Sequence, residues 1–123
     1  MQVSKNFHLR EFGCNDGTGV PYDLYHNVRE LANRLQVIRD FLGVPIFISS
    51  GYRTLNYNQR VGGAKKSQHL TASAADIYSP YLNSLDIFNA ILELEKKNML
   101  KVGGLSLYPT FVHFDIRSER VIF

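Results

Sequence analysis

The sequence contains a single cysteine, no tryptophan and only four histidines. Because Cys14 stands alone, the chain has no internal disulfide framework and no zinc site built from several thiolates. No apolar run approaches about 18 residues, which excludes a transmembrane helix. The N-terminus has no basic segment followed by an apolar one, so we expect synthesis in the cytoplasm without a secretory signal peptide.

What the chain does contain suits one globular domain spanning residues 1–123. Hydrophobic residues make up 45%, and seven Tyr and eight Phe supply bulky side chains for a core that needs no disulfide. Fourteen Lys and Arg against eleven Asp and Glu leave a net charge of +3. The lysines form only short pairs, Lys65-Lys66 and Lys96-Lys97, and no nucleic-acid-binding motif is present, so we expect no nucleic-acid partner.

Helical and strand patterns interleave along the chain. Apolar residues recur every three or four positions from Leu24 to Leu42, which predicts a helix of about five turns. By the same reasoning, further helices or helical turns are expected at 4–12, at 56–60 and from 83 or 84, and strands at 45–50, 74–77, 105–107, 111–116 and 121–123. Because the last strands form a hairpin, the expected fold class is α+β, a small domain with a mostly antiparallel sheet flanked by helices.

The strand at 111–116 has one apolar face and one polar face. Side chains alternate along a strand, so the two faces separate as Val112, Phe114 and Ile116 against His113, Asp115 and Arg117. Three polar residues of these types, backed by a wholly apolar face, indicate a site. The alternative is an exposed strand with ordinary polar residues directed outward.

A second group of polar residues lies upstream, in Ser67–Ile77. Asp76 follows Ala74-Ala75, and a carboxylate within such a small, apolar run must be paired or metal-bound if it is buried. With His69 and His113 it would give two imidazoles and one carboxylate, a donor set that leaves an open fourth position on a catalytic Zn²⁺. The alternatives are a turn-capping role for Asp76 and a surface position for His69.

These residues lie in five sequence blocks that follow one another in the same order as the motifs of a known family. The blocks are Ser49–Arg53, Val61–Ala64, Ser67–His69, Ala74–Ile77 and Phe111–Arg117. In them the chain resembles peptidase family M15, the zinc D-Ala-D-Ala carboxypeptidases and murein endopeptidases, and most of all the compact subgroup common in bacteriophages and prophages. The N-terminal segment and the long helix are similar too, so the resemblance covers nearly the whole chain.

The resemblance implies a fold, a cofactor and roles for individual residues. The fold is a small Hedgehog- or D-Ala-D-Ala-peptidase-like domain that carries Zn²⁺ on one side of its sheet. The zinc ligands would be His69, Asp76 and His113. Arg53 would bind the substrate carbonyl or the oxyanion that develops from it, and Ser67 and Gln68 match the motif around the first ligand and would contact substrate.

Two positions depart from the family pattern. Ala72 stands where the family often has glycine, and an alanine would be strained there if the backbone is left-handed. Thr110 stands where several branches have the glutamate that serves as general base. Asp115 is the nearest carboxylate, and it could act as the base, orient a ligand imidazole from behind, or hold Arg117.

The expected function is cleavage of peptidoglycan stem peptides by a zinc-dependent carboxypeptidase or endopeptidase, such as a phage endolysin. Zinc and Arg53 would share the charge that develops on the scissile carbonyl, with Asp115 as the candidate catalytic base. The alternative is a non-catalytic wall-binding or virion-associated module that keeps zinc for stability. We expect a monomer that reaches the cell wall after holin- or virion-mediated delivery.

Overall fold

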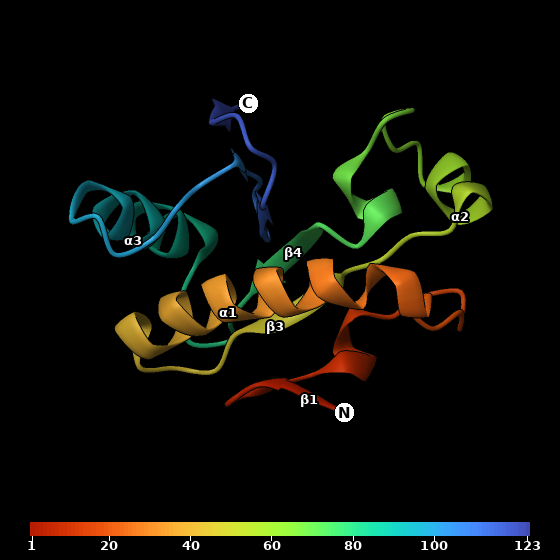
Figure 1. Cartoon of the computed structure of the whole chain (residues 1–123). Coiled ribbons are helices and arrows are strands. Elements are labelled where there is room, and N and C mark those ends of the chain that lie inside the picture. The colour runs from red at the N-terminus through yellow and green to blue at the C-terminus, as the bar shows by residue number, and fades with distance from the viewer.

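A five-stranded sheet with two long helices packed on one face forms the centre of the molecule (Figure 1). The computed structural model describes residues 1–123. The α-helices are α1 (Tyr25–Leu42), α2 (Leu55–Arg60) and α3 (Ser84–Lys96). The strands are β1 (Gln2–Ser4), β2 (Phe7–His8), β3 (Phe47–Ser50), β4 (Ala74–Tyr78), β5 (Gly104–Leu107), β6 (Val112–Asp115) and β7 (Val121–Ile122). Three short 3-10 helices are η1 (Leu9–Phe12), η2 (Tyr22–Leu24) and η3 (Gln68–Thr71).

The strands of the main sheet are ordered β3-β4-β6-β5-β7. Every neighbouring pair is antiparallel except β5 and β7, which are parallel. The expected α+β class with a mostly antiparallel sheet is therefore confirmed. The register of β4 and β6 places Asp76 opposite His113 and Ala74 opposite Asp115, so two motifs far apart in sequence become neighbours on one face.

The other face of the sheet packs on α1 and α3 and forms the hydrophobic core. Val28, Leu31 and Leu35 recur along one side of α1 and are fully buried, each worth about 2 kcal/mol of transfer free energy. The sheet contributes the apolar members of its alternating pattern, Ala75, Ile77, Leu105, Val112 and Phe114. This packing fixes the orientation of β4 and β6. The polar residues that alternate with the buried ones, such as Asp76 and His113, therefore point to the opposite face of the sheet.

The N-terminal segment differs from its prediction. The expected helical turn at 4–12 exists only as η1, and β1 and β2 form a hairpin before it. Phe7 is buried in the core, and both Ser4 Oγ and the backbone N–H of Asn6 donate to Gln36 Oε1 on α1, at 2.9 and 2.8 Å. These contacts with α1 override the local helical tendency, which is why sequence pattern alone does not reveal the hairpin.

Other predicted helical features are confirmed. The turn at 56–60 is α2, whose N-cap residue Thr54 accepts a hydrogen bond from the backbone N–H of Tyr57 at 3.1 Å. Asn83 caps α3 in the same way, accepting from the backbone N–H of Asp86 at 2.8 Å. No helix combines the length and apolar character that crossing a membrane requires.

Candidate metal centre

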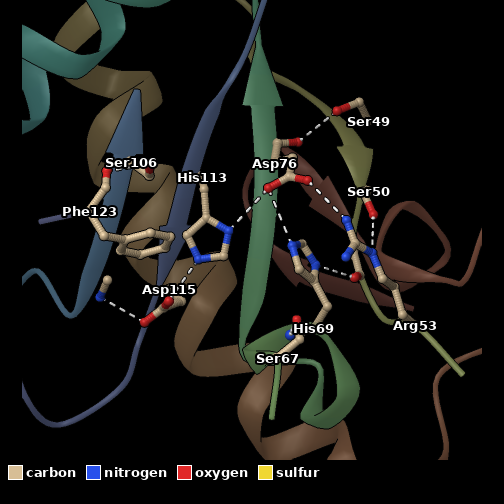
Figure 2. A network of polar contacts seen from close by, with 12 residues as sticks. Ser49, Ser50, Arg53, Ser67, His69, Asp76, Ser106, His113, Asp115 and Phe123 are labelled. Carbon is tan, nitrogen blue, oxygen red and sulfur yellow. Dashed lines mark hydrogen bonds and ion pairs between the residues drawn. The ribbon is translucent and has the colours of Figure 1, made fainter. Parts of the chain in front are cut away.

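Three side chains from separate elements converge on one point of the polar face (Figure 2). His69 comes from η3, Asp76 from β4 and His113 from β6, and all three are buried. Asp76 Oδ1 lies 3.3 Å from His69 Nε2 and 3.2 Å from His113 Nδ1. One potential ligand atom from each residue lies within 4.8 Å of the others, so the group can hold a metal ion. The structure thus brings the three ligands expected from the sequence together.

A short capped turn positions His69. Ser67 Oγ accepts a hydrogen bond from the backbone N–H of His69 at 3.2 Å and starts the η3 turn. The ring Nδ1 of His69 lies 2.7 Å from the carbonyl oxygen of Gly51. Because a carbonyl only accepts, Nδ1 carries the proton, and a neutral His69 turns the lone pair of Nε2 toward Asp76.

The buried carboxylate of Asp115 contacts the His113 ring on the side that faces away from Asp76. His113 Nε2 lies 2.8 Å from Asp115 Oδ2. Burial raises the pKa of Asp115, but hydrogen bonds from His113, Arg117 and two backbone N–H groups outweigh burial and hold that pKa well below its usual range. Because the ionised carboxylate only accepts, Nε2 carries the proton, and a neutral His113 turns the lone pair of Nδ1 toward Asp76.

The charges at Asp76 are those that a metal site needs. Burial raises the pKa of Asp76, but in the metal-free protein the hydrogen bonds that His113 and His69 donate when protonated outweigh burial and lower this pKa to about 2, so the carboxylate is ionised at neutral pH. Burial lowers the pKa of His113, but its hydrogen bonds to Asp115 and Asp76 more than compensate and raise it. A proton on this ring therefore competes with a metal ion for the same nitrogen.

The donor set fits a divalent cation such as zinc. Asp76 Oδ1 lies 3.2 to 3.3 Å from the nitrogen of each imidazole that carries a lone pair. This arrangement is repulsive unless a proton or a cation lies among the three atoms. Two nitrogens and one oxygen are the protein ligands typical of a catalytic zinc site, which keeps a further position open. Both imidazoles also have a hydrogen-bond acceptor on the nitrogen that faces away from Asp76, as metal-binding histidines usually do.

Asp115 lies behind His113, and its side chain is fully buried. Oδ1 accepts from the backbone N–H of Gly104 at 2.7 Å, and Oδ2 accepts from Arg117 Nη2 at 2.6 Å and contacts His113. A Cβ at residue 104 would overlap this carboxylate, so the close approach requires glycine there. Asp115 does not line the pocket described below. This geometry favours orientation of the imidazole over direct proton transfer, among the roles expected for Asp115.

Arg53 lies on the opposite side of the centre, beside Asp76 (Figure 2). Each nitrogen of its guanidinium faces one side-chain oxygen: Nε donates to Ser50 Oγ at 3.1 Å, Nη1 to Asn58 Oδ1 at 3.2 Å and Nη2 to Asp76 Oδ2 at 3.4 Å. A guanidinium has five N–H groups, so two remain for other partners. Arg53 lines the pocket, so its guanidinium borders the space that a bound molecule would occupy.

A pocket of about 540 Å³ opens over the three candidate ligands. Ser67 and Gln68, the two residues expected to contact substrate, both line it, although the Ser67 hydroxyl also holds the η3 turn. Asp76 is the only acidic side chain among the lining residues. The wall also carries two further cations and three aromatic rings, from Lys66, Arg117, Tyr108, Phe111 and Phe123. A molecule bound there therefore meets positive charge, aromatic surface and the candidate metal ligands together.

The roles of several residues of the site cannot be read from the sequence. Gly51 acts through its backbone carbonyl, and Asn58 lies in a polar helix that gives no reason to single it out. Phe123 packs edge-on against the His113 ring, with 5.3 Å between ring centres, on the side away from Asp76 (Figure 2). The glycine pair Gly62-Gly63 is one signal that the sequence does offer. Adjacent glycines mark a turn, and a glycine has no side chain to keep a neighbouring group away.

Ala72 has the left-handed backbone that its position in the motif led us to consider. Its φ is 56° and its ψ is 32°, and it follows η3 as the C-cap residue. An alanine in this conformation costs about 1 kcal/mol relative to a right-handed one. The turn that carries His69 is therefore closed by a strained residue where the family often has glycine.

Comparison with protein families relates this site to a known enzyme group. The family model described as Peptidase M15 matches residues 5–115 of the 123-residue chain, a range that includes all three candidate ligands and Arg53. Comparison with curated proteins returned no match. Because the family match extends over most of the chain and over the whole candidate centre, the chain belongs to the peptidase M15 family.

Proposed function

We propose that the protein is a zinc metallopeptidase that cleaves peptidoglycan stem peptides, as a D-Ala-D-Ala carboxypeptidase or a murein endopeptidase. Membership of the family supports peptide hydrolysis. The observation that carries the metal-dependent part is the convergence of His69, Asp76 and His113 in one pocket with Arg53. The choice of peptidoglycan rests on the resemblance of the five motif blocks.

The residues of the site divide the work of peptide hydrolysis. When bound by the three ligands, zinc supplies a Lewis acid that polarises a carbonyl group and lowers the pKa of water toward about 7. The two remaining N–H groups of Arg53 donate to the carbonyl oxygen, on which negative charge grows as the bond is attacked. Gln68 contacts the peptide from the pocket wall, and Ser67 holds the turn that carries His69.

Asp115 acts through His113 in this proposal. Its ionised carboxylate fixes the tautomer of the imidazole and increases the electron density on Nδ1, which strengthens that nitrogen as a ligand. Arg117 and the backbone N–H of Gly104 balance the buried negative charge. Asp115 is therefore proposed as a positioning residue, in place of the role of proton acceptor.

One observation favours a second function. Asp76 is the only acidic side chain that lines the pocket, and Thr110 stands where several branches of the family have a catalytic glutamate. A site with no separate proton acceptor suits a non-catalytic module that binds the cell wall and keeps zinc for stability. Such a module would bind peptidoglycan through the same pocket and release nothing from it.

Digestion of purified peptidoglycan separates the two functions. The zinc-loaded protein is incubated with the polymer, with and without a chelator, and the products are identified by mass spectrometry of the muropeptides. We expect new peptide ends whose release the chelator blocks, and their masses identify the bond that is cleaved. Binding without release supports the module, and neither binding nor release contradicts both functions. His69→Ala, which lacks one ligand, serves as the matched control.

A further inference from the structure

Asn58 is a buried polar residue on a helix that is otherwise largely exposed. Its relative exposure is 1%, whereas Leu55, Asn56, Gln59 and Arg60 of the same helix are exposed. Both ends of its side-chain amide are used: Oδ1 accepts from Arg53 Nη1 at 3.2 Å, and Nδ2 donates to the carbonyl oxygen of Ala64 at 2.9 Å. A buried amide that is hydrogen-bonded at both ends joins its two partners at a fixed separation.

The segment around residue 63 is shaped to admit this amide. A Cβ at residue 63 would overlap Asn58 Oδ1 and lie 3.0 Å from Arg53 Nη1, so only glycine fits there. The backbone N–H of Gly63 also donates to the backbone carbonyl of Asn58 at 2.8 Å. Residues 61–64 line the pocket, so Asn58 connects this wall of the pocket to the guanidinium of Arg53.

The side chain at position 58 is an uncharged hydrogen-bond acceptor, and this affects the charge of Arg53. The Arg53 guanidinium already faces one carboxylate, Asp76, through Nη2 at 3.4 Å. A second carboxylate at position 58 would compete with Asp76 for that cation and neutralise the charge that faces the pocket. A neutral acceptor holds Nη1 in place and leaves the positive charge of the guanidinium available.

We infer that Asn58 is a positioning residue that fixes the Arg53 guanidinium, so that its two remaining N–H groups face the substrate carbonyl. The consequence for catalysis rests on the proposed function, whereas the effect on Arg53 itself does not. The competing interpretation is that Asn58 only supports the fold by satisfying the Ala64 carbonyl. The two interpretations differ in what happens to Arg53 when the amide is removed or displaced.

Two variants disturb the contact in different ways. Asn58→Ala removes the amide, and Gly63→Ala keeps it but pushes it away with a methyl group. If one variant does not fold, the other still provides the test. The controls are Asn56→Ala, an exposed asparagine of the same helix, and Gly19→Ala, a glycine with no atom near the added methyl group.

The first measurement requires no substrate. Hydrogen exchange of the Arg53 side-chain N–H groups is followed by nitrogen NMR in the zinc-loaded protein, with the signals assigned by their loss in Arg53→Lys. We expect exchange to become about tenfold faster in both test variants, with wild-type rates in the controls and one bound zinc in all of them. Unchanged exchange in the folded test variants overturns the inference, whether or not the protein is a peptidase.

The second measurement separates positioning from support of the fold. At a temperature where all variants are folded, we expect kcat on peptidoglycan peptides to fall about tenfold with KM nearly unchanged, because Arg53 acts on the charge that develops during the reaction. A loss of thermal stability with unchanged kcat overturns the inference. Absence of any hydrolysis by the wild type contradicts the proposed function instead, and the exchange measurement then decides the role of Asn58.

Discussion

The two histidines of the candidate metal centre are supported in different ways. A backbone carbonyl, that of Gly51, holds the far nitrogen of His69. A buried carboxylate, that of Asp115, which is paired with Arg117, holds the far nitrogen of His113. A carbonyl orients a ring without adding charge, whereas an ionised carboxylate also makes the imidazole a stronger donor. The backbone therefore orients His69, whereas the side chains of Asp115 and Arg117 orient His113 and make it a stronger ligand.

The largest effect is expected when either ring is removed. His69→Ala and His113→Ala each delete one of three protein ligands, and both variants should lose stoichiometric zinc despite their different supports. The bound metal is measured by elemental analysis after dialysis against buffer. Full retention of zinc in both variants would show that the metal site is assigned to the wrong residues.

The next effect tests the His69 side of the centre, where Arg53 faces the pocket. Arg53→Ala should lower kcat on peptidoglycan peptides by roughly 10² to 10³, because a donor to the developing oxyanion is lost, while zinc stays bound. Steady-state kinetics and metal analysis on the same samples check both points. Arg60→Ala, at an exposed arginine of α2, is the control and should keep wild-type kcat. A kcat within a factor of about two of wild type in Arg53→Ala would exclude this role.

A smaller effect tests the His113 side. Asp115→Asn keeps the size of the side chain but removes its charge, so zinc affinity should fall by about 10- to 100-fold. Competition with a chelator of known affinity measures the change. Asp86→Asn, at an exposed position of α3, should leave the affinity unchanged. Equal zinc affinities in Asp115→Asn and wild type would mean that the charge of Asp115 adds nothing to His113 as a ligand. This would contradict the difference between the two histidines.

The smallest effect is the pH dependence of the metal-free protein. The pKa of His113 is raised in the folded state, so its contribution to stability is complete below about 6.5 and is lost as pH rises through the folded pKa. The pKa of Asp76 is lowered to about 2, so its contribution is present above its ordinary value of 3.8 and is lost as pH falls toward 2. We expect the free energy of unfolding, measured by denaturant with a chelator present, to be highest between these limits.

His113→Gln provides the control for this profile. The variant has no ring to titrate, so its stability should lose the decline on the alkaline side and keep a smaller decline on the acid side, where His69 still contacts Asp76. Metal-free wild type that becomes more stable between pH 6 and pH 9 would contradict the raised pKa of His113.

The sequence points to two of the three candidate ligands, His113 and Asp76, because the signals at these positions are local. Alternation along 111–116 separates His113 from the apolar Val112 and Phe114, and the structure shows these two buried in the core. The small residues around Asp76 indicate a buried carboxylate, and the structure shows one paired with two imidazoles. Each inference needs only a few adjacent residues and the geometry of a strand.

The supporting residues are not predictable in the same way. The contact of Gly51 with His69 is made by a backbone atom, which no side-chain pattern reports. The contact of Asn58 with Arg53 depends on how α2 packs, and the glycines at 63 and 104 are required by neighbours that only the folded chain brings close. The N-terminal hairpin is not predictable from the sequence for the same reason, because its hydrogen bonds to Gln36 of α1 are tertiary contacts.

The proposed function depends on one metal ion held by His69, Asp76 and His113. The most direct test is anomalous X-ray diffraction at the zinc absorption edge from crystals of the zinc-loaded protein. We expect a single strong peak bounded by His69 Nε2, His113 Nδ1 and a carboxylate oxygen of Asp76. A stoichiometric zinc ion bound elsewhere, or no peak among these atoms at saturating zinc, would contradict it.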